Sequence, residues 1–232
     1  MTTNVDAPPS TQDRTAGAGA PRRPLVVVLL AVIAVAVLAV AVAVGHLWGT
    51  GTVSSAGSVS ATSVDAGFAR DMSTHHTQAV TMAGYERDNT KSPALKTVAY
   101  DIETSQYFQL GEMQGWLDTW GLGRESSVPQ MAWMGHTGGL ESDGLMPGMA
   151  TPAQMTRLQT MHGTPMDILF LQLMINHHLG GLPMAQYAAD HAATPYVRQL
   201  AQSMVSVQSS QIAQMEQLLR QLGGSPLAPP IT

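Results

Sequence analysis

Apolar residues form one continuous run early in the chain and follow a helical period after it. Residues 25–44 are twenty apolar residues without a charge, the length that a helix needs to cross the hydrocarbon core of a bilayer. Between Phe68 and Ala83, and again between Ala99 and Leu117, core-type residues recur every three or four positions and so lie on one helical face. The pattern predicts a membrane-spanning helix followed by amphipathic helices.

The amphipathic part consists of two copies of one unit. An offset of 102 residues aligns positions 62–121 with positions 164–223 without a gap. The recurring pairs include Asp65/Asp167, Phe68/Phe170, Met72/Met174, His75/His177, His76/His178, Met82/Met184, Met113/Met215 and Leu117/Leu219. Each copy is therefore a whole structural unit, and two copies predict pseudo-twofold symmetry.

Each copy has the start and stop signals of a helical hairpin. The predicted N-caps are Thr62 and Ser92 in the first copy and Thr164 and Thr194 in the second, and the predicted stops are Gly121 and Gly223. Two hairpins whose apolar stripes face each other predict an all-α fold, a four-helix bundle.

Composition and turn signals divide the chain into seven segments. We predict a disordered cytoplasmic tail over 1–24, a transmembrane anchor over 25–44 and a flexible tether over 45–61. The hairpins over 62–121 and 164–224 are joined by a Met-rich linker over 122–163, and a tail follows over 225–232. Thr151, Pro152 and Gln154 form a capping-box signal for a short helix in the linker.

The charges around the apolar run predict the orientation of the chain in the membrane. Arg14, Arg22 and Arg23 precede the run, and no Lys or Arg follows it before Arg70, which places residues 1–24 in the cytoplasm and the hairpins outside. A cleaved signal peptide is the alternative, although its apolar region is usually about 7–15 residues long. We predict a single-pass protein of the cell membrane.

Composition narrows the possible chemistry. The chain has no cysteine, which excludes disulfides, thiolate zinc sites, iron–sulfur clusters and cysteine nucleophiles, but it has 15 methionines among 232 residues. Its net charge of −5 argues against a nucleic-acid partner, which would require a basic face. Imidazole, carboxylate and thioether groups remain as candidate metal ligands.

The motif M-x-x-H-H-x-x-A-x-x-M-A places nitrogen and sulfur donors on one helical face. Met72 is a helical neighbour of both His75 and His76, and a second copy of the motif repeats the arrangement. Thioether and neutral imidazole ligands together favour copper, above all Cu(I), over zinc, magnesium or calcium. The candidate ligands are Met72, His75, His76, Met82, Met174, His177, His178 and Met184.

The same residues can also be explained by packing. Methionine is a common filler of helical cores, and buried imidazoles need hydrogen-bond partners, which Gln106, Gln109, Gln208 and Gln211 could supply. Asp65 and Asp167 are expected to have a structural role at the helix starts. The linker, with Met131, Met134, His136, Met146 and Met149, is either a capture arm for Cu(I) or a hydrophobic cover docked on the bundle.

These motifs resemble a bacterial family known as domain of unknown function family 305. The resemblance covers residues 62–223 and includes Gln106-x-x-Gln109-x-x-x-Met113 and Met146-Pro147-Gly148-Met149. It implies a ferritin-like fold, export or anchoring, and in some members copper binding, with Met113 and Met215 as secondary ligands. The chain departs from the family pattern at Gln109, where a Glu is expected, and at Gly181-Leu182-Pro183.

These observations lead to one predicted function and one main alternative. We predict an anchored extracytoplasmic protein that binds Cu(I) for sequestration or handover and is not an enzyme; its protein partner is unknown. The alternative is a metal-free helical interaction module of the cell envelope. An iron- or copper-dependent oxidase is weaker, because the inward positions lack the Glu residues of a di-iron bundle.

Overall fold

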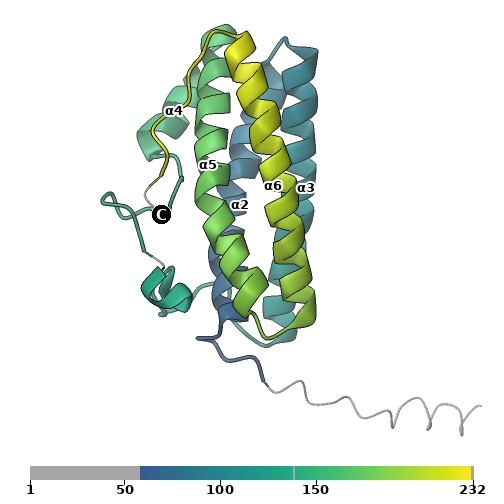
Figure 1. Ribbon diagram of the computed structural model, residues 1–232, viewed down its shortest axis with the longest axis vertical. Helices are drawn as coiled ribbons and strands as arrows, with labels where there is room; N and C mark the ends of the chain where they lie inside the picture. Colours follow the sequence, from purple (N-terminus) through teal and green to yellow (C-terminus); the bar gives the residue numbers. More distant parts are fainter. Residues whose placement is uncertain (1–57, 138, 231–232) are drawn as a thin grey trace, which may run out of the picture. The chain divides into compact units, whose positions relative to one another are not determined.

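The computed structural model describes residues 58–137 and 139–230, which are folded around four long helices (Figure 1). These are α2 (Val64–Asn89), α3 (Pro93–Thr119), α5 (Thr164–His191) and α6 (Pro195–Gln221). The linker between α3 and α5 contains a 3-10 helix, η1 (Ala132–Thr137), and a short helix, α4 (Pro152–Thr160). The described residues contain no strand, so this part of the chain is all-α, as the pattern predicts.

The four helices form two hairpins that correspond to the two copies of the repeat. Helix α2 packs on α3, α5 packs on α6, and the hairpins meet mainly through α2 and α5. Helix α6 begins and ends 102 residues after α3, the offset seen in the sequence. Figure 1 shows the linker and α4 on the side of the bundle near α2 and α5, away from α3.

The first helix of each hairpin begins one residue away from the predicted cap. The side chain of Ser63, not that of Thr62, accepts the Ala66 amide at 3.2 Å, because Ser63 is the residue adjacent to the first helical turn. Helix α5 is preceded by Gly163 with φ 66°, so Thr164 lies inside the helix. The prediction that Thr62 and Thr164 are the N-caps is therefore wrong.

The second helix of each hairpin begins and ends as predicted. Ser92 and Thr194 are the N-caps of α3 and α6. Past their ends, Gly121 and Gly223 have φ values of 67° and 75°, a conformation that favours glycine. The amides of Leu122 and Gly224 then donate at 2.9 Å to carbonyls in the last turns, which terminates both helices.

The linker is a cover on the bundle. One carboxylate oxygen of Asp71 accepts the Met131 amide at 2.7 Å and the indole Nε1–H of Trp133 at 2.8 Å. A Cβ at Gly67 would overlap the Trp133 ring, so the ring rests on backbone. Met131, Met134 and Met146 are buried, the arrangement expected of a hydrophobic cover.

The predicted cytoplasmic tail, the anchor over 25–44 and most of the tether lie outside the described residues, and no described helix combines the length and apolarity that a membrane crossing requires. At the other end, Gln172 and Asn176 of α5 donate to the carbonyls of Ser225 and Ala228, at 2.6 and 2.9 Å. The described part of the C-terminal tail therefore lies along α5.

Candidate metal centre

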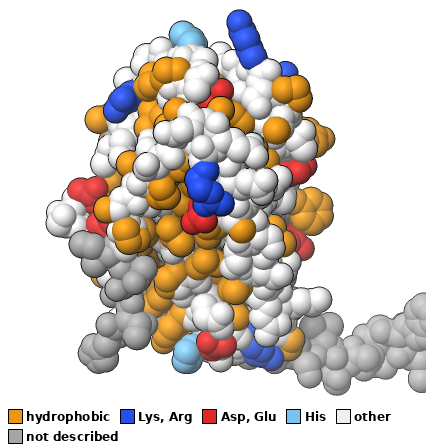
Figure 2. Space-filling model, turned by 45° about the horizontal axis from the view of Figure 1, so that its top comes forward, with side chains coloured by type: hydrophobic (Ala, Val, Ile, Leu, Met, Phe, Trp, Pro, Cys, Tyr) orange, Lys and Arg blue, Asp and Glu red, His pale blue; other side chains and the backbone are white. Residues whose placement is uncertain are grey.

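All eight predicted ligands are inside the bundle. The side chains of Met72, His75, His76, Met82, Met174, His177, His178 and Met184 are at most 1% exposed. On the face drawn in Figure 2, histidine side chains are visible only near the two ends of the molecule. Any ion bound by the motif residues would be separated from bulk water.

The two copies of the motif meet at one place. The rings of His75 and His177, which are equivalent in the repeat, lie with centroids 3.7 Å apart and planes tilted by 38°. The ring of His178 is 6.3 Å from that of His177. Because α2 and α5 pack against each other, the duplicated His-His pairs build one joint histidine layer and not two remote sites.

Each imidazole in the histidine layer donates one hydrogen bond through Nε2. His76 donates to Gln109 Oε1 at 2.8 Å, and its counterpart His178 donates to Gln211 Oε1 at 2.9 Å. His75 donates to the Pro147 carbonyl at 3.1 Å, and His177 donates to the His75 carbonyl at 2.9 Å. Since all four acceptors are oxygens without a proton, each Nε2 must carry the hydrogen.

Burial keeps these imidazoles neutral. It lowers the pKa of His75 and His178 to about 4 and that of His76 to about 3, and it holds the pKa of His177 well below its usual range. A neutral imidazole with its hydrogen on Nε2 has a lone pair on Nδ1. The Nδ1 atoms of His75 and His76 are buried without a hydrogen-bond partner.

The four predicted thioethers divide into two sets, each with one residue from each copy. Met72 and Met184 belong to one buried cluster, together with Met113. Met82 and Met174 belong to the other, together with Met215. Each set therefore combines the start of one motif with the end of the other, as antiparallel packing of α2 on α5 requires.

A soft cation fits this donor set better than a hard one. Among the described residues, no three side chains of the His, Asp and Glu types are grouped as a metal site. The candidate donors inside the bundle are neutral imidazoles and thioethers. Neutral nitrogen and sulfur donors are what Cu(I) prefers. They do not neutralise a buried ion, which also favours a monovalent cation over a divalent one.

The glutamines of the second helices have two different roles. Gln109 and Gln211 accept from histidines, as predicted, but Gln106 and Gln208 do not bond to the histidine rings in this way. Both amide atoms of Gln106 and the Oε1 atom of Gln208 are buried without a partner. The bundle interior thus contains glutamine amide atoms that form no hydrogen bond within the protein.

A buried carboxyl pair at one end of the bundle was missed by the sequence analysis. Glu86 of α2 is fully buried and faces Asp167 of α5, and no well-formed hydrogen bond satisfies its two oxygens. Burial, together with the negative charge of Asp167, raises the pKa of Glu86 to about 8. The signal in the sequence is a mismatch of the repeat, because Ala188 is the counterpart of Glu86.

The aspartate at the start of α2 has a structural role, as expected. The carboxylate of Asp65 accepts the amides of Ala193 and Thr194 at 2.9 and 2.8 Å, immediately before α6. It therefore caps a helix of the other hairpin and not its own.

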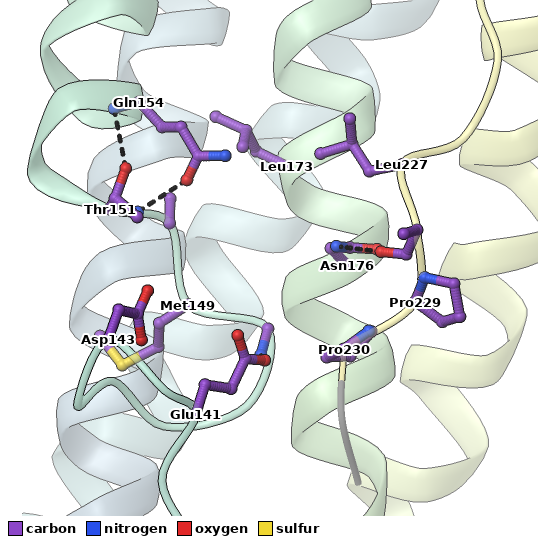
Figure 3. A pocket seen from close by; sticks show the side chains of 13 residues that line it. Glu141, Asp143, Met149, Thr151, Gln154, Leu173, Asn176, Leu227, Pro229 and Pro230 are labelled. Carbon is purple, nitrogen blue, oxygen red and sulfur yellow. Dashed lines mark hydrogen bonds between the residues drawn. The ribbon is translucent and has the colours of Figure 1, made fainter.

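A cavity of about 300 Å³ lies outside the histidine layer, between the linker, α5 and the C-terminal segment. Figure 3 shows the sulfur of Met149 beside Asp143, with Leu227 and Pro229 across the cavity. None of the eight predicted ligands lines this cavity. The cavity and the histidine layer are separate features.

Comparison with known proteins identifies the relatives of the chain. The family model described as "Domain of unknown function (DUF305)" matches residues 65–219. No curated protein sequence matches.

Three solved structures match about two thirds or more of this chain. A DUF305 protein from Streptomyces coelicolor, described as a candidate secreted protein, is 43% identical and has a TM-score of 0.68, covering 73% of this chain and 99% of that one. A DUF305 fragment from Deinococcus radiodurans is 28% identical with a TM-score of 0.58 over 68% and 96%. CopM in its Cu(II)-bound form is 25% identical, with a TM-score of 0.53 over 68% and 97%.

Proposed function

The chain belongs to the DUF305 family, and on this premise we propose that it binds copper, as Cu(I), through histidine and methionine side chains of the bundle. The proposed ligands are the eight residues of the duplicated motif. Binding and release of the ion, without a chemical transformation, is the proposed activity. It would serve sequestration or handover of copper outside the cytoplasm.

The observation that supports the proposal is the state of the four imidazoles. Each is neutral and has its Nε2–H fixed by an amide or backbone oxygen. This is the arrangement in which an outer hydrogen bond orients a metal-binding histidine and leaves the other nitrogen for the ion. The thioethers of Met72, Met82, Met174 and Met184 are buried on the same helices and would supply soft donors.

Two further facts agree with the proposal. CopM, with which this chain shares 25% of its residues and its bundle, has been solved in Cu(II)-bound and Cu(I)-bound forms. Residues 25–44 have the composition of a membrane anchor, and an extracytoplasmic protein without cysteine would gain soft ligands from methionine that resist disulfide formation.

The alternative function is a metal-free interaction module. It is favoured by the fact that every motif histidine already has one good hydrogen bond, which a packed core histidine also needs. The two functions differ in what they require of Nδ1. A packing histidine gains nothing from a buried nitrogen without a partner, whereas a ligand requires one.

Replacement of sulfur with little change of shape distinguishes these functions. We would titrate the full-length protein in mild detergent with Cu(I) against a competing chelator, with Cu(II) and Zn(II) in parallel. The variant would combine Met72→Leu, Met82→Leu, Met174→Leu and Met184→Leu, since Leu and Met have similar volumes. Met155→Leu with Met161→Leu on the α4 side is the matched control, because these methionines lie outside the motif.

We expect tight Cu(I) binding by the wild type and the control, and a loss of at least about 100-fold in the fourfold variant, since each removed donor weakens the site. Equal binding by the fourfold variant, or no binding by the wild type, would favour the interaction module.

A further inference from the structure

The linker segment over residues 147–150 lies across the junction of α2 and α5 and contacts equivalent positions of the two repeats. Gln78 of α2 holds it with both ends of its amide: Oε1 accepts the Ala150 amide at 2.7 Å, and Nε2 donates to the Ala150 carbonyl at 2.9 Å. The counterpart of Gln78 in the second repeat is Gly180. A Cβ at Gly180 would overlap the Pro147 carbonyl and lie 2.7 Å from the Gly148 amide nitrogen.

A second glycine makes the same contact from the linker side. Gly148 has φ 76°, and a Cβ there would overlap the Asn176 carbonyl of α5 and lie 3.1 Å from the Gly180 Cα. The linker and α5 thus touch backbone to backbone, and neither position leaves room for a side chain. One repeat holds the segment by hydrogen bonds, and the other makes space for it.

This contact reaches the histidine layer through the Pro147 carbonyl. That carbonyl accepts the Nε2–H of His75, whereas the equivalent hydrogen of His177 goes to the His75 carbonyl. Exact symmetry would give His75 the carbonyl of His177 as its acceptor. The linker therefore replaces one of the two symmetric hydrogen bonds.

With the Nε2–H of His75 bonded to the Pro147 carbonyl, Nδ1 is the ring nitrogen without a hydrogen-bond partner. The Nδ1 atom is 3.5 Å from the place that a Cβ would take at Gly181, and the Oε1 atom of Gln208 is 3.2 Å from the same place. Both atoms lack a hydrogen-bond partner. With Nε2 bound to the linker, Nδ1 lies beside Gly181 of α5, and the unused Gln208 Oε1 lies beside the same residue.

We propose that the segment over 147–150 is a positioning element of the copper site, seated by Gly180, Gly148 and Gln78. It holds the tautomer and ring orientation of His75 and makes the two halves of the duplicated site unequal. This inference rests on the proposed function. Loss of such an outer hydrogen bond typically weakens metal binding 10–100-fold.

The test compares Gly180→Ala and Gln78→Ala with Gly111→Ala in the full-length protein. Gly111 is also a glycine inside a helix, but nothing lies within 4 Å of a Cβ there. The metal-free proteins are labelled with ¹⁵N-histidine, and NMR reports the tautomer of His75 and the exchange of its Nε2–H with water. Cu(I) affinity is then measured by competition titration.

In Gly180→Ala and in Gln78→Ala, we expect the Nε2–H of His75 to exchange faster, its nitrogen shifts to move toward a tautomer mixture, and Cu(I) affinity to fall at least about tenfold. Gly111→Ala is expected to stay within about twofold of wild type on both readouts. If Gly180→Ala does not fold, Gln78→Ala decides alone, because it leaves the backbone contact of α5 unchanged.

Two results would overturn the proposal. One is an unchanged His75 tautomer and exchange rate in the variants; the other is a changed tautomer with Cu(I) affinity within twofold of wild type. If the wild type binds no Cu(I), the proposed function fails instead. In that case the tautomer measurement still decides whether the linker positions His75.

Discussion

The two hairpins contain the same candidate ligands but support them differently. In the first hairpin, Asp65 reaches across to the amides that precede α6. Its counterpart Asp167 faces Glu86, which the second hairpin replaces with Ala188. The chemistry of the motif is thus duplicated while its surroundings are not, and each difference between equivalent positions offers an internal control.

The largest effect is expected at Glu86, an ionisable residue whose counterpart in the second repeat is Ala188. Because the pKa of Glu86 is about 8 in the folded protein and near 4.5 when exposed, the folded state binds more protons between these values. The free energy of unfolding therefore falls as pH rises through this window. We expect Glu86→Gln to match wild type at about pH 5 and to be more stable at about pH 9 by on the order of 4 kcal/mol.

Chemical denaturation at both pH values measures this difference. Glu112→Gln, an exposed position on α3, is the control and should show no such dependence on pH. A wild-type protein whose stability does not decline between about pH 5 and pH 9 would show that Glu86 is not held protonated.

The next effect compares the two aspartates directly. Asp65→Ala removes two charge-assisted, partly buried hydrogen bonds to backbone amides and should cost about 3 kcal/mol of unfolding free energy. Asp167→Ala should cost less than about 1 kcal/mol at neutral pH, because the Oδ1 atom of Asp167 is buried without a hydrogen-bond partner and its removal breaks no such pair of bonds. Equal losses in denaturant unfolding of the two variants would contradict the different roles assigned to them.

A smaller effect tests the grouping of the thioethers. Met72 and Met184 come from different repeats but share one cluster, whereas Met82 lies in the other. In double-mutant cycles with Leu, we expect the losses in Cu(I) binding free energy to couple by about 0.5–3 kcal/mol for Met72 with Met184. The pair Met72 and Met82 should be additive within about 0.5 kcal/mol. The reverse pattern would mean that each repeat builds its own site.

The smallest effect tests a position where the repeats differ without consequence for the site. Gly111 is equivalent to Ala213, and a Cβ at Gly111 would meet nothing within 4 Å. Gly111→Ala should raise the unfolding free energy by about 0.5–1 kcal/mol through helix propensity and leave Cu(I) affinity unchanged. Thermal unfolding and the titration together measure this; a destabilised variant would reveal a contact on this face of α3.

The helices and their inward stripes could be predicted because they depend on local pattern. The spacing of Phe68, Met72 and His76 assigns a buried face without any tertiary information, and the repeat confirms the same face in α5. The caps of the first helices were missed by one residue, since Ser63 and Thr62 are both good cap residues and only the position of the first turn distinguishes them.

The arrangement around the ligands could not be predicted, because it depends on packing between distant segments. The antiparallel contact of α2 and α5 decides that Met72 is grouped with Met184, and the linker decides which acceptor His75 has. Among the glutamines, Gln109 and Gln211 bond to histidine while Gln106 and Gln208 do not, although all four have the right spacing. The membrane anchor over 25–44 stays a prediction.

X-ray absorption at the copper edge of the Cu(I)-loaded full-length protein tests the central claim most directly, because it identifies the ligand atoms. We predict nitrogen and sulfur neighbours together, at about 2.0 and 2.3 Å as in comparable first-row sites, and loss of the sulfur shell in the fourfold Met→Leu variant. Copper with only nitrogen and oxygen neighbours, or a sulfur shell that survives in that variant, would contradict a copper site built from the duplicated motif.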